Sequence, residues 1–154
     1  MQIVVDWTWK YWTEASGGWE LLKSWAATLV KYPVPEGVLK EYFELAHAIM
    51  LLHRKYCQNR KYKDVEKDVW AELHVPKEIE TAFSNAGKEF NEYEENFVLA
   101  CVAVVRAKKG GACLAHYAIR RRSENAIWVK VKKMFEQVPI PTEEYEAGDL
   151  ADDR

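Results

Sequence analysis

The residues with the clearest chemical meaning in this chain are cations that gather in two stretches. Residues 54–63 carry five lysines and arginines and no acid, and residues 106–135 carry nine against a single acid, Glu124. The whole chain has a net charge of −2. Lysine and arginine neutralise phosphates and release the counterions that surround a nucleic acid. The two stretches therefore predict a polyanionic partner, and nucleic acid is the one that we expect.

The predicted binding residues come from both stretches. They are Arg54, Lys55, Arg60, Lys61, Lys63, Arg106, Lys108, Lys109, Arg120, Arg121, Arg122, Lys130 and Lys133. The three consecutive arginines fan over about 200° of a helix, whereas Arg122, Lys130 and Lys133 share one stripe. No base-reading motif accompanies them, so we expect the backbone and shape of the nucleic acid to be recognised. An alternative stays open, in which these are ordinary solvated faces or surfaces that meet acidic blocks of neighbouring subunits.

An enzymatic or metal site is the competing interpretation. Glu44 and His47 have the spacing that di-iron helical bundles use twice, and Glu41 lies one turn earlier. The second copy of this motif is absent, and Cys113 with His116 is the nearest substitute. The chain also lacks a glycine-rich phosphate loop and any recognisable Ser/His/Asp or Cys/His signature. We therefore expect no enzymatic activity, no metal and no cofactor.

Composition places the chain among globular proteins. It has 154 residues, 49% of them hydrophobic and 30% charged, which is enough to bury a core without metals or disulfides. Seven tryptophans and eight tyrosines indicate a large core or large subunit interfaces. The three cysteines form no CxxC or zinc spacing, so buried thiols and an intracellular origin are expected.

Neither a targeting segment nor a membrane span is expected. The first twelve residues include Asp6 and Lys10 and lack the continuous apolar region of a signal peptide. The apolar run at residues 97–105 is only nine residues long, whereas a bilayer-spanning helix needs about 20.

Acidic residues are gathered into blocks as well. Residues 64–95 carry ten acids and three lysines, and residues 136–154 carry seven acids and one arginine. Blocks of one sign that alternate along a chain indicate complementary surfaces between copies, or a cationic groove set apart from an acidic exterior.

Hydrophobic spacing predicts helices from residue 16 onward. Apolar residues recur every three or four positions after Gly17 and Gly18 and again over residues 36–57. A shorter helix is expected over residues 64–73 with Asp64 as its N-cap. Another begins at Pro76 and continues through Tyr93 into the apolar run, with Gly87 as its weak spot.

The centre of the predicted fold is a long antiparallel helix hairpin. Gly110 and Gly111 are expected to end its first helix, because glycine adopts the left-handed conformation at no steric cost. The second helix is expected over residues 112–135. Its two apolar faces are offset by roughly 70°, so either Ser123 interrupts it or it packs on different sides along its length. The predicted class is all-α, a helical bundle.

Three segments are expected along the chain. Residues 1–18 form an N-terminal arm, extended because β-forming and aromatic residues alternate along it, residues 19–137 a helical domain and residues 138–154 an acidic tail. The aromatic arm either lies across a neighbouring subunit or completes the chain's own core. We favour the neighbouring subunit, because the glycines after Ser16 separate the arm from the helix that follows.

A helix hairpin with arginine clusters, an aromatic arm and no catalytic residues resembles the major capsid proteins of filamentous archaeal viruses. The resemblance implies a non-enzymatic structural subunit that wraps double-stranded DNA, often as dimers of two related coat proteins, in a virion assembled in the host cytoplasm. The chain is also similar to the small helical subunits of CRISPR ribonucleoprotein effector complexes, which implies a cytoplasmic location. A plain helical protein-interaction domain is the third hypothesis. DNA or RNA, the host and the number of partner chains stay open.

Overall fold

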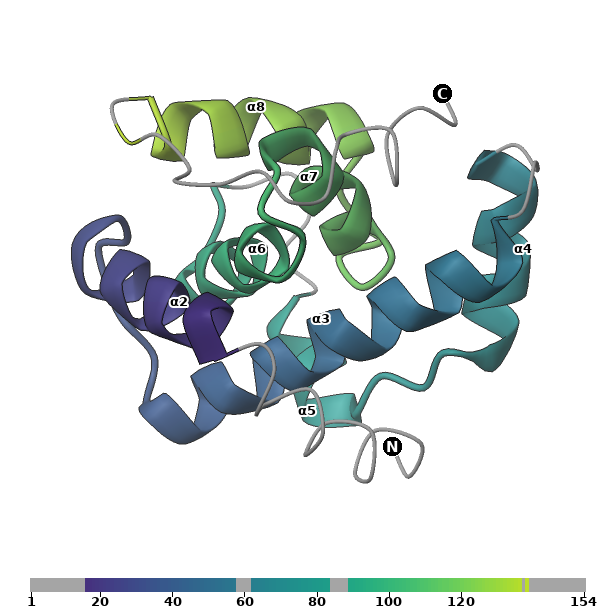
Figure 1. Cartoon of the computed structure of the whole chain (residues 1–154), viewed down its shortest axis with the longest axis horizontal. Helices are drawn as coiled ribbons and strands as arrows, with labels where there is room; N and C mark the ends of the chain where they lie inside the picture. The colour runs from purple at the N-terminus through teal and green to yellow at the C-terminus, as the bar shows by residue number, and fades with distance from the viewer. Residues whose placement is uncertain (1–15, 58–61, 84–88, 137, 139–154) are drawn as a thin grey trace.

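The computed structural model describes residues 16–57, 62–83, 89–136 and 138, and all regular structure within these ranges is helical (Figure 1). The helices are α2 (Ser16–Thr28), α3 (Glu36–Tyr56), α4 (Tyr62–Glu72), α5 (Lys77–Ala82), α6 (Glu92–Val105), α7 (Lys108–His116) and α8 (Glu124–Met134). This confirms the all-α prediction. Among these helices none combines the length and apolarity needed to cross a bilayer. Residues 1–15 of the predicted arm and residues 139–154 of the predicted tail lie outside the described residues. Residues 16–18 were expected in the extended arm but are the first residues of α2, so Gly17 and Gly18 do not separate the arm from this helix.

Helix α6 is the centre of the molecule. It packs against α2, α3 and α7, and α8 lies beyond α7 (Figure 1). Every residue from Asn96 to Val105 is buried. A helix that is apolar all round has to be covered on all sides, and each large apolar side chain buried there stabilises the fold by about 1.5–3 kcal/mol. The uncharged run at residues 97–105 is therefore the core of the bundle.

The start of α6 corrects one prediction. We expected a single helix from Pro76 into the apolar run, but α5 ends at Ala82 and α6 begins after Asn91. The Asn91 side chain accepts a hydrogen bond from the Glu94 amide at 2.8 Å, and the Glu94 carboxylate accepts one from the Asn91 amide at 2.9 Å. This reciprocal capping box satisfies two amides that a helix start leaves unpaired. The expected weak spot at Gly87 lies outside the described residues.

The turn between α6 and α7 is a second correction. Gly110 and Gly111 do not end a helix; they lie inside α7 and are buried. The turn is made instead by Arg106, the C-cap of α6, in the left-handed conformation with φ 53°. A Cβ added to Gly111 would lie 2.5 Å from Val102 Cγ2 and 2.8 Å from Val102 Cα. Gly111 therefore permits the close approach of α7 to α6.

The predicted helix over residues 112–135 is two helices. Ser123 is the N-cap of α8, and its hydroxyl accepts a hydrogen bond from the Ala126 amide at 3.0 Å. This confirms the alternative in which Ser123 interrupts the helix. The expected helix over residues 36–57 is confirmed as α3. Helix α4 begins at Tyr62, so Asp64 lies in its first turn and is not its N-cap.

Candidate nucleic-acid interface

The predicted binding residue Arg122 is buried, with 8% of its surface exposed. Its Nε lies 2.6 Å from one carboxylate oxygen of Glu94, and its Nη2 lies 3.1 Å from the other. Nη2 also donates to the Glu89 carbonyl at 3.2 Å, and the guanidinium stacks 4.1 Å from the ring centre of Phe90. Arg122 thus holds the α7–α8 loop on the start of α6, and its charge does not face solvent.

Two further predicted cations are neutralised within the chain. Lys130 Nζ lies 2.7 Å from Glu95, and Lys55 Nζ lies 3.2 Å from Glu72. Tyr56 also donates a hydrogen bond to Glu72. The hydrogen bonds from Tyr56 and Lys55 lower the pKa of Glu72, and the bond to Glu72 raises the pKa of Lys55. The predicted stripe of Arg122, Lys130 and Lys133 therefore retains only Lys133 as an exposed cation without an ion pair in the described ranges.

Other predicted residues have structural positions. Arg106 makes the α6–α7 turn, and Lys108 Nζ donates to the Phe135 carbonyl at 3.4 Å. Arg54 is half-buried in the last turn of α3. Arg60 and Lys61 lie outside the described residues. Lys63 belongs to α4, and its side chain is likewise outside the description.

Five cations of the second basic stretch are exposed and form no ion pair with a carboxylate in the described part of the chain. Lys109, Lys132 and Lys133, here called the lysine group, lie at the start of α7 and the end of α8. The Lys108–Phe135 hydrogen bond brings these two helix ends together. Arg120 and Arg121, the arginine loop, lie between α7 and α8. Helix α8 separates the two groups by about 16 Å, given 1.5 Å per residue.

The arginine loop is held in place by α4. The Arg120 guanidinium stacks 4.1 Å from the ring centre of Trp70, and Trp70 Nε1 donates to the Tyr117 carbonyl at 3.1 Å. His116 adds a contact of 3.2 Å with Glu66. Trp70 was not among the predicted site residues. Its place on α4, outside the apolar face of Val65 and Val69, was the available signal.

Two side chains that could bind a metal or react, His47 and Cys101, are buried in the protein interior. His47 is buried, and its Nδ1 lies 3.1 Å from the Phe43 carbonyl. Burial lowers the pKa of His47 to about 4, and burial raises the pKa of the Cys101 thiol. Within the described ranges, no three His, Cys, Asp or Glu side chains come together as metal ligands. Glu44 and His47 therefore have no third potential metal ligand beside them in the described residues.

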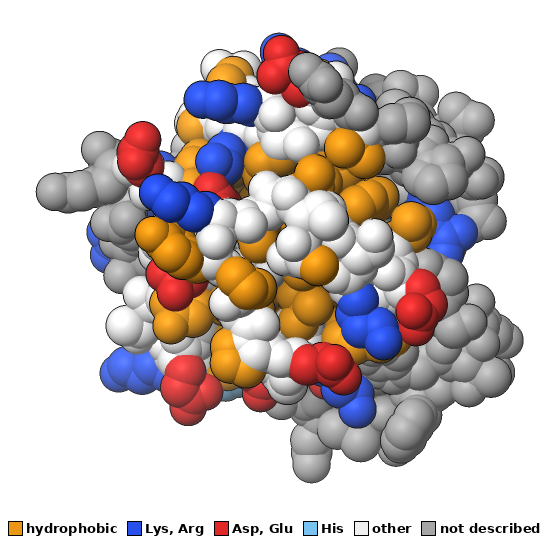
Figure 2. Space-filling model, turned by 90° about the vertical axis from the view of Figure 1, so that its left-hand side faces the viewer, with side chains coloured by type: hydrophobic (Ala, Val, Ile, Leu, Met, Phe, Trp, Pro, Cys, Tyr) orange, Lys and Arg blue, Asp and Glu red, His pale blue; other side chains and the backbone are white. Residues whose placement is uncertain are grey.

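Charges of both signs are mixed on the face shown in Figure 2. Lysine and arginine side chains there stand beside carboxylates and between patches of apolar side chains. Lysines and arginines therefore do not form one continuous patch on this face. The lysine group and the arginine loop are the candidates for a cationic interface, because their cations are exposed.

No protein-family description, curated protein or solved structure matches this chain.

Proposed function

We propose that the protein is a non-enzymatic structural subunit that binds the backbone of nucleic acid, with double-stranded DNA favoured, through the lysine group and the arginine loop. One observation carries this proposal. Of the eleven cations in the basic stretches whose side chains the structure describes, six have a partner or a structural position inside the chain, whereas these five remain exposed. Exposed cations without an internal counterion are the ones that can exchange small ions for phosphates.

The two groups differ in how they would contact phosphate. Arg120 is oriented by its stacking on Trp70, so less side-chain entropy is lost when it binds. Lys132 lies 5.1 Å from the ring centre of Trp128, whereas Lys109 and Lys133 extend from the ends of their helices as point charges. Such contacts read charge and spacing, and they carry no base sequence.

Five cations per chain would bind nucleic acid weakly, and repetition would supply the rest. When many copies bind side by side on one strand or duplex, their effective concentration multiplies a weak contact. A helical nucleoprotein assembly such as the capsid of a filamentous virus, formed with copies of itself or a related coat protein in the host cytoplasm, has this property. The acids of residues 64–95 that remain exposed, such as Glu78 on α5, would then face cations of neighbouring subunits.

Charge reversal tests the proposal. Arg120→Glu with Arg121→Glu, and separately Lys132→Glu with Lys133→Glu, should each weaken binding to a fluorescent duplex measured by anisotropy. Arg122 stays unchanged, because reversing it would place a carboxylate beside buried Glu94 and unfold the protein. Lys23→Glu is the control, since Lys23 lies on α2 beside Glu20, outside both groups. The logarithm of the wild-type affinity should fall with that of salt concentration at a slope of up to about −4.5 for five phosphate contacts.

Unchanged affinity in both double variants, or a flat salt dependence, would contradict nucleic-acid binding. A second candidate would then stand, a helical protein-interaction domain. The neutralisation of Lys55, Arg122 and Lys130 by internal carboxylates favours that candidate, as does the mixed face in Figure 2. Sedimentation of the nucleic-acid-free protein at rising concentration would measure its self-association.

A further inference from the structure

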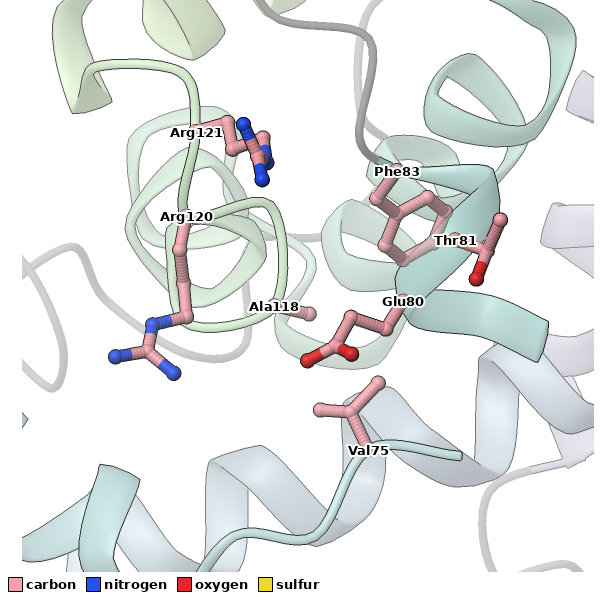
Figure 3. A pocket seen from close by; sticks show the side chains of 7 residues that line it. All are labelled: Val75, Glu80, Thr81, Phe83, Ala118, Arg120 and Arg121. Carbon is pink, nitrogen blue, oxygen red and sulfur yellow. The ribbon is translucent and has the colours of Figure 1, made fainter. Parts of the chain in front are cut away.

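A cavity lies between α5 and the arginine loop (Figure 3). Its volume is about 460 Å³, within the range of about 300–1,000 Å³ that small-molecule sites occupy. The lining residues are Val75, Glu80, Thr81, Phe83, Ala118, Arg120 and Arg121. They come from α5 and its C-cap, from the connection that precedes α5 and from the connection between α7 and α8, so the cavity is formed only when these segments meet.

The lining combines an apolar part with charges of both signs. Phe83 and Ala118 are buried and Val75 is partly buried, whereas Glu80, Arg120 and Arg121 are exposed. In Figure 3 the Arg121 guanidinium points toward the side where Phe83 lies, and the Glu80 carboxylate extends between Ala118 and Val75. Within the described residues, neither Glu80 nor Arg121 forms an ion pair. Both charges are therefore available to a ligand.

The arrangement requires an anionic group at one end of the ligand and hydrogen-bond donors at another. Guanidinium groups pair with phosphate oxygens in a fixed fork. Arg121 can supply this fork, because its guanidinium faces the side of Phe83, whereas the Arg120 guanidinium points away from it and stacks on Trp70 (Figure 3). A carboxylate only accepts hydrogen bonds and repels phosphate, so Glu80 has to meet N–H donors. Apolar side chains between the two ends can support a flat ring.

We propose that this cavity binds one guanine nucleotide unit. Its phosphate pairs with Arg121, its base lies over the apolar lining, and Glu80 accepts from the N1–H and the N2 amino group. Guanine is the common base that presents two adjacent donors on that edge. Adenine presents an acceptor beside its amino group, and the pyrimidines offer a single donor position. The unit is either a free nucleotide or the phosphorylated 5′ end of a strand, and the inference does not depend on duplex binding by the lysine group.

Calorimetric titration of the full chain tests the proposal with guanosine 5′-monophosphate, adenosine 5′-monophosphate, guanosine and inorganic phosphate. Guanosine monophosphate should bind at least about tenfold more tightly than each of the others, because each of them lacks one charged hydrogen-bonding contact. Equal binding of guanosine monophosphate and inorganic phosphate would overturn the proposal, and so would the absence of binding.

Two variants test which residue contacts the phosphate and which contacts the base. Arg121→Ala should weaken guanosine monophosphate binding about tenfold. Glu80→Gln should shift the preference from guanine to adenine, because a glutamine side chain can both donate and accept and pairs with adenine in two places. Both residues are exposed, so neither change should unfold the chain. An unchanged base preference in Glu80→Gln would contradict the assigned orientation.

A final pair of measurements identifies the source of the nucleotide and separates this proposal from the previous one. An oligonucleotide that begins with a 5′-phosphorylated guanosine should bind more tightly than its 5′-hydroxyl form if the ligand is a strand end. If it binds no better than guanosine monophosphate, the ligand is the free nucleotide. The Lys132→Glu/Lys133→Glu variant should bind the duplex more weakly and keep guanosine monophosphate binding. Weaker binding of both would overturn the independence of the cavity.

Discussion

The start of α6 and the exposed loop between α7 and α8 draw on the same run of three arginines, and they use them in opposite ways. Arg122 is buried against Glu94 and Phe90, whereas Arg121, one residue earlier, is exposed. The interior position converts a positive charge into a structural contact that a partner cannot reach. The exposed position leaves the charge available. A basic stretch in a sequence therefore measures surface charge only after the internal pairs are subtracted.

The largest expected effect on stability comes from replacing the buried Arg122. Arg122→Met should destabilise the protein by about 3–5 kcal/mol, because it leaves the Glu94 carboxylate buried without its partner. The melting temperature should fall by roughly 10 °C. Arg121→Met is the matched control and should change the stability by less than about 0.5 kcal/mol. Combining Arg122→Met with Glu94→Met should recover much of the loss. Equal melting of the two single variants would refute the contrast.

The buried His47 should make the stability of the protein depend on pH. The pKa of His47 is about 4 because of burial, below the value of about 6.5 expected in the unfolded chain. The unfolded chain therefore binds the proton first as the pH falls from about 6.5 to about 4. Stability should drop through this window by up to about 3 kcal/mol, since a tenfold difference in proton affinity corresponds to about 1.4 kcal/mol.

Urea unfolding at a series of pH values measures the contribution of His47. His47→Gln should remove this part of the pH dependence. His74→Gln is the control, because His74 is exposed between α4 and α5, and this variant should keep the wild-type profile. An identical profile in His47→Gln and the wild type would count against the buried neutral histidine.

Two glycines, Gly111 in a helix contact and Gly37 at an open position, show the same contrast with a smaller expected effect on stability. Gly111→Ala should cost about 1–3 kcal/mol, because the new Cβ meets the Val102 backbone where α7 crosses α6. Gly37→Ala should stabilise the protein by about 0.5–1 kcal/mol, because its Cβ would have no atom within 4 Å and alanine favours the helix. Thermal unfolding of both variants checks the pair, and a cost for Gly37→Ala as large as that for Gly111→Ala would be inconsistent with this packing.

The smallest effect is expected for lysines. Lys130 lies 2.7 Å from Glu95, and both side chains are largely covered, whereas Lys133 is exposed. Lys130→Met should destabilise the protein by no more than about 1 kcal/mol, and Lys133→Met should have no measurable effect. The difference should shrink at high salt. A difference that survives high salt would indicate that Lys130 acts through packing instead of charge.

The sequence supported those parts of the fold that depend on local patterns. Helix α3 follows from regular apolar spacing, and the burial of α6 follows from the absence of charge between residues 97 and 105. The sequence was less informative about the candidate nucleic-acid interface. The cations were identified by type, but Arg122 and Lys130 could not be distinguished from Arg121 and Lys133, because their carboxylate partners lie about 30 residues away.

What the sequence determined by itself is an all-helical chain with a buried apolar segment and an excess of cations after it, since periodicity and composition are local properties. The tertiary structure decided which cations stay exposed and which glycine allows two helices to touch. Gly111 has the sequence signature of a helix end, yet it lies inside α7, at a position where Val102 leaves no room for a side chain. Arg106 makes the turn in its place. Such roles depend on atoms brought together from distant positions, and no local pattern records them.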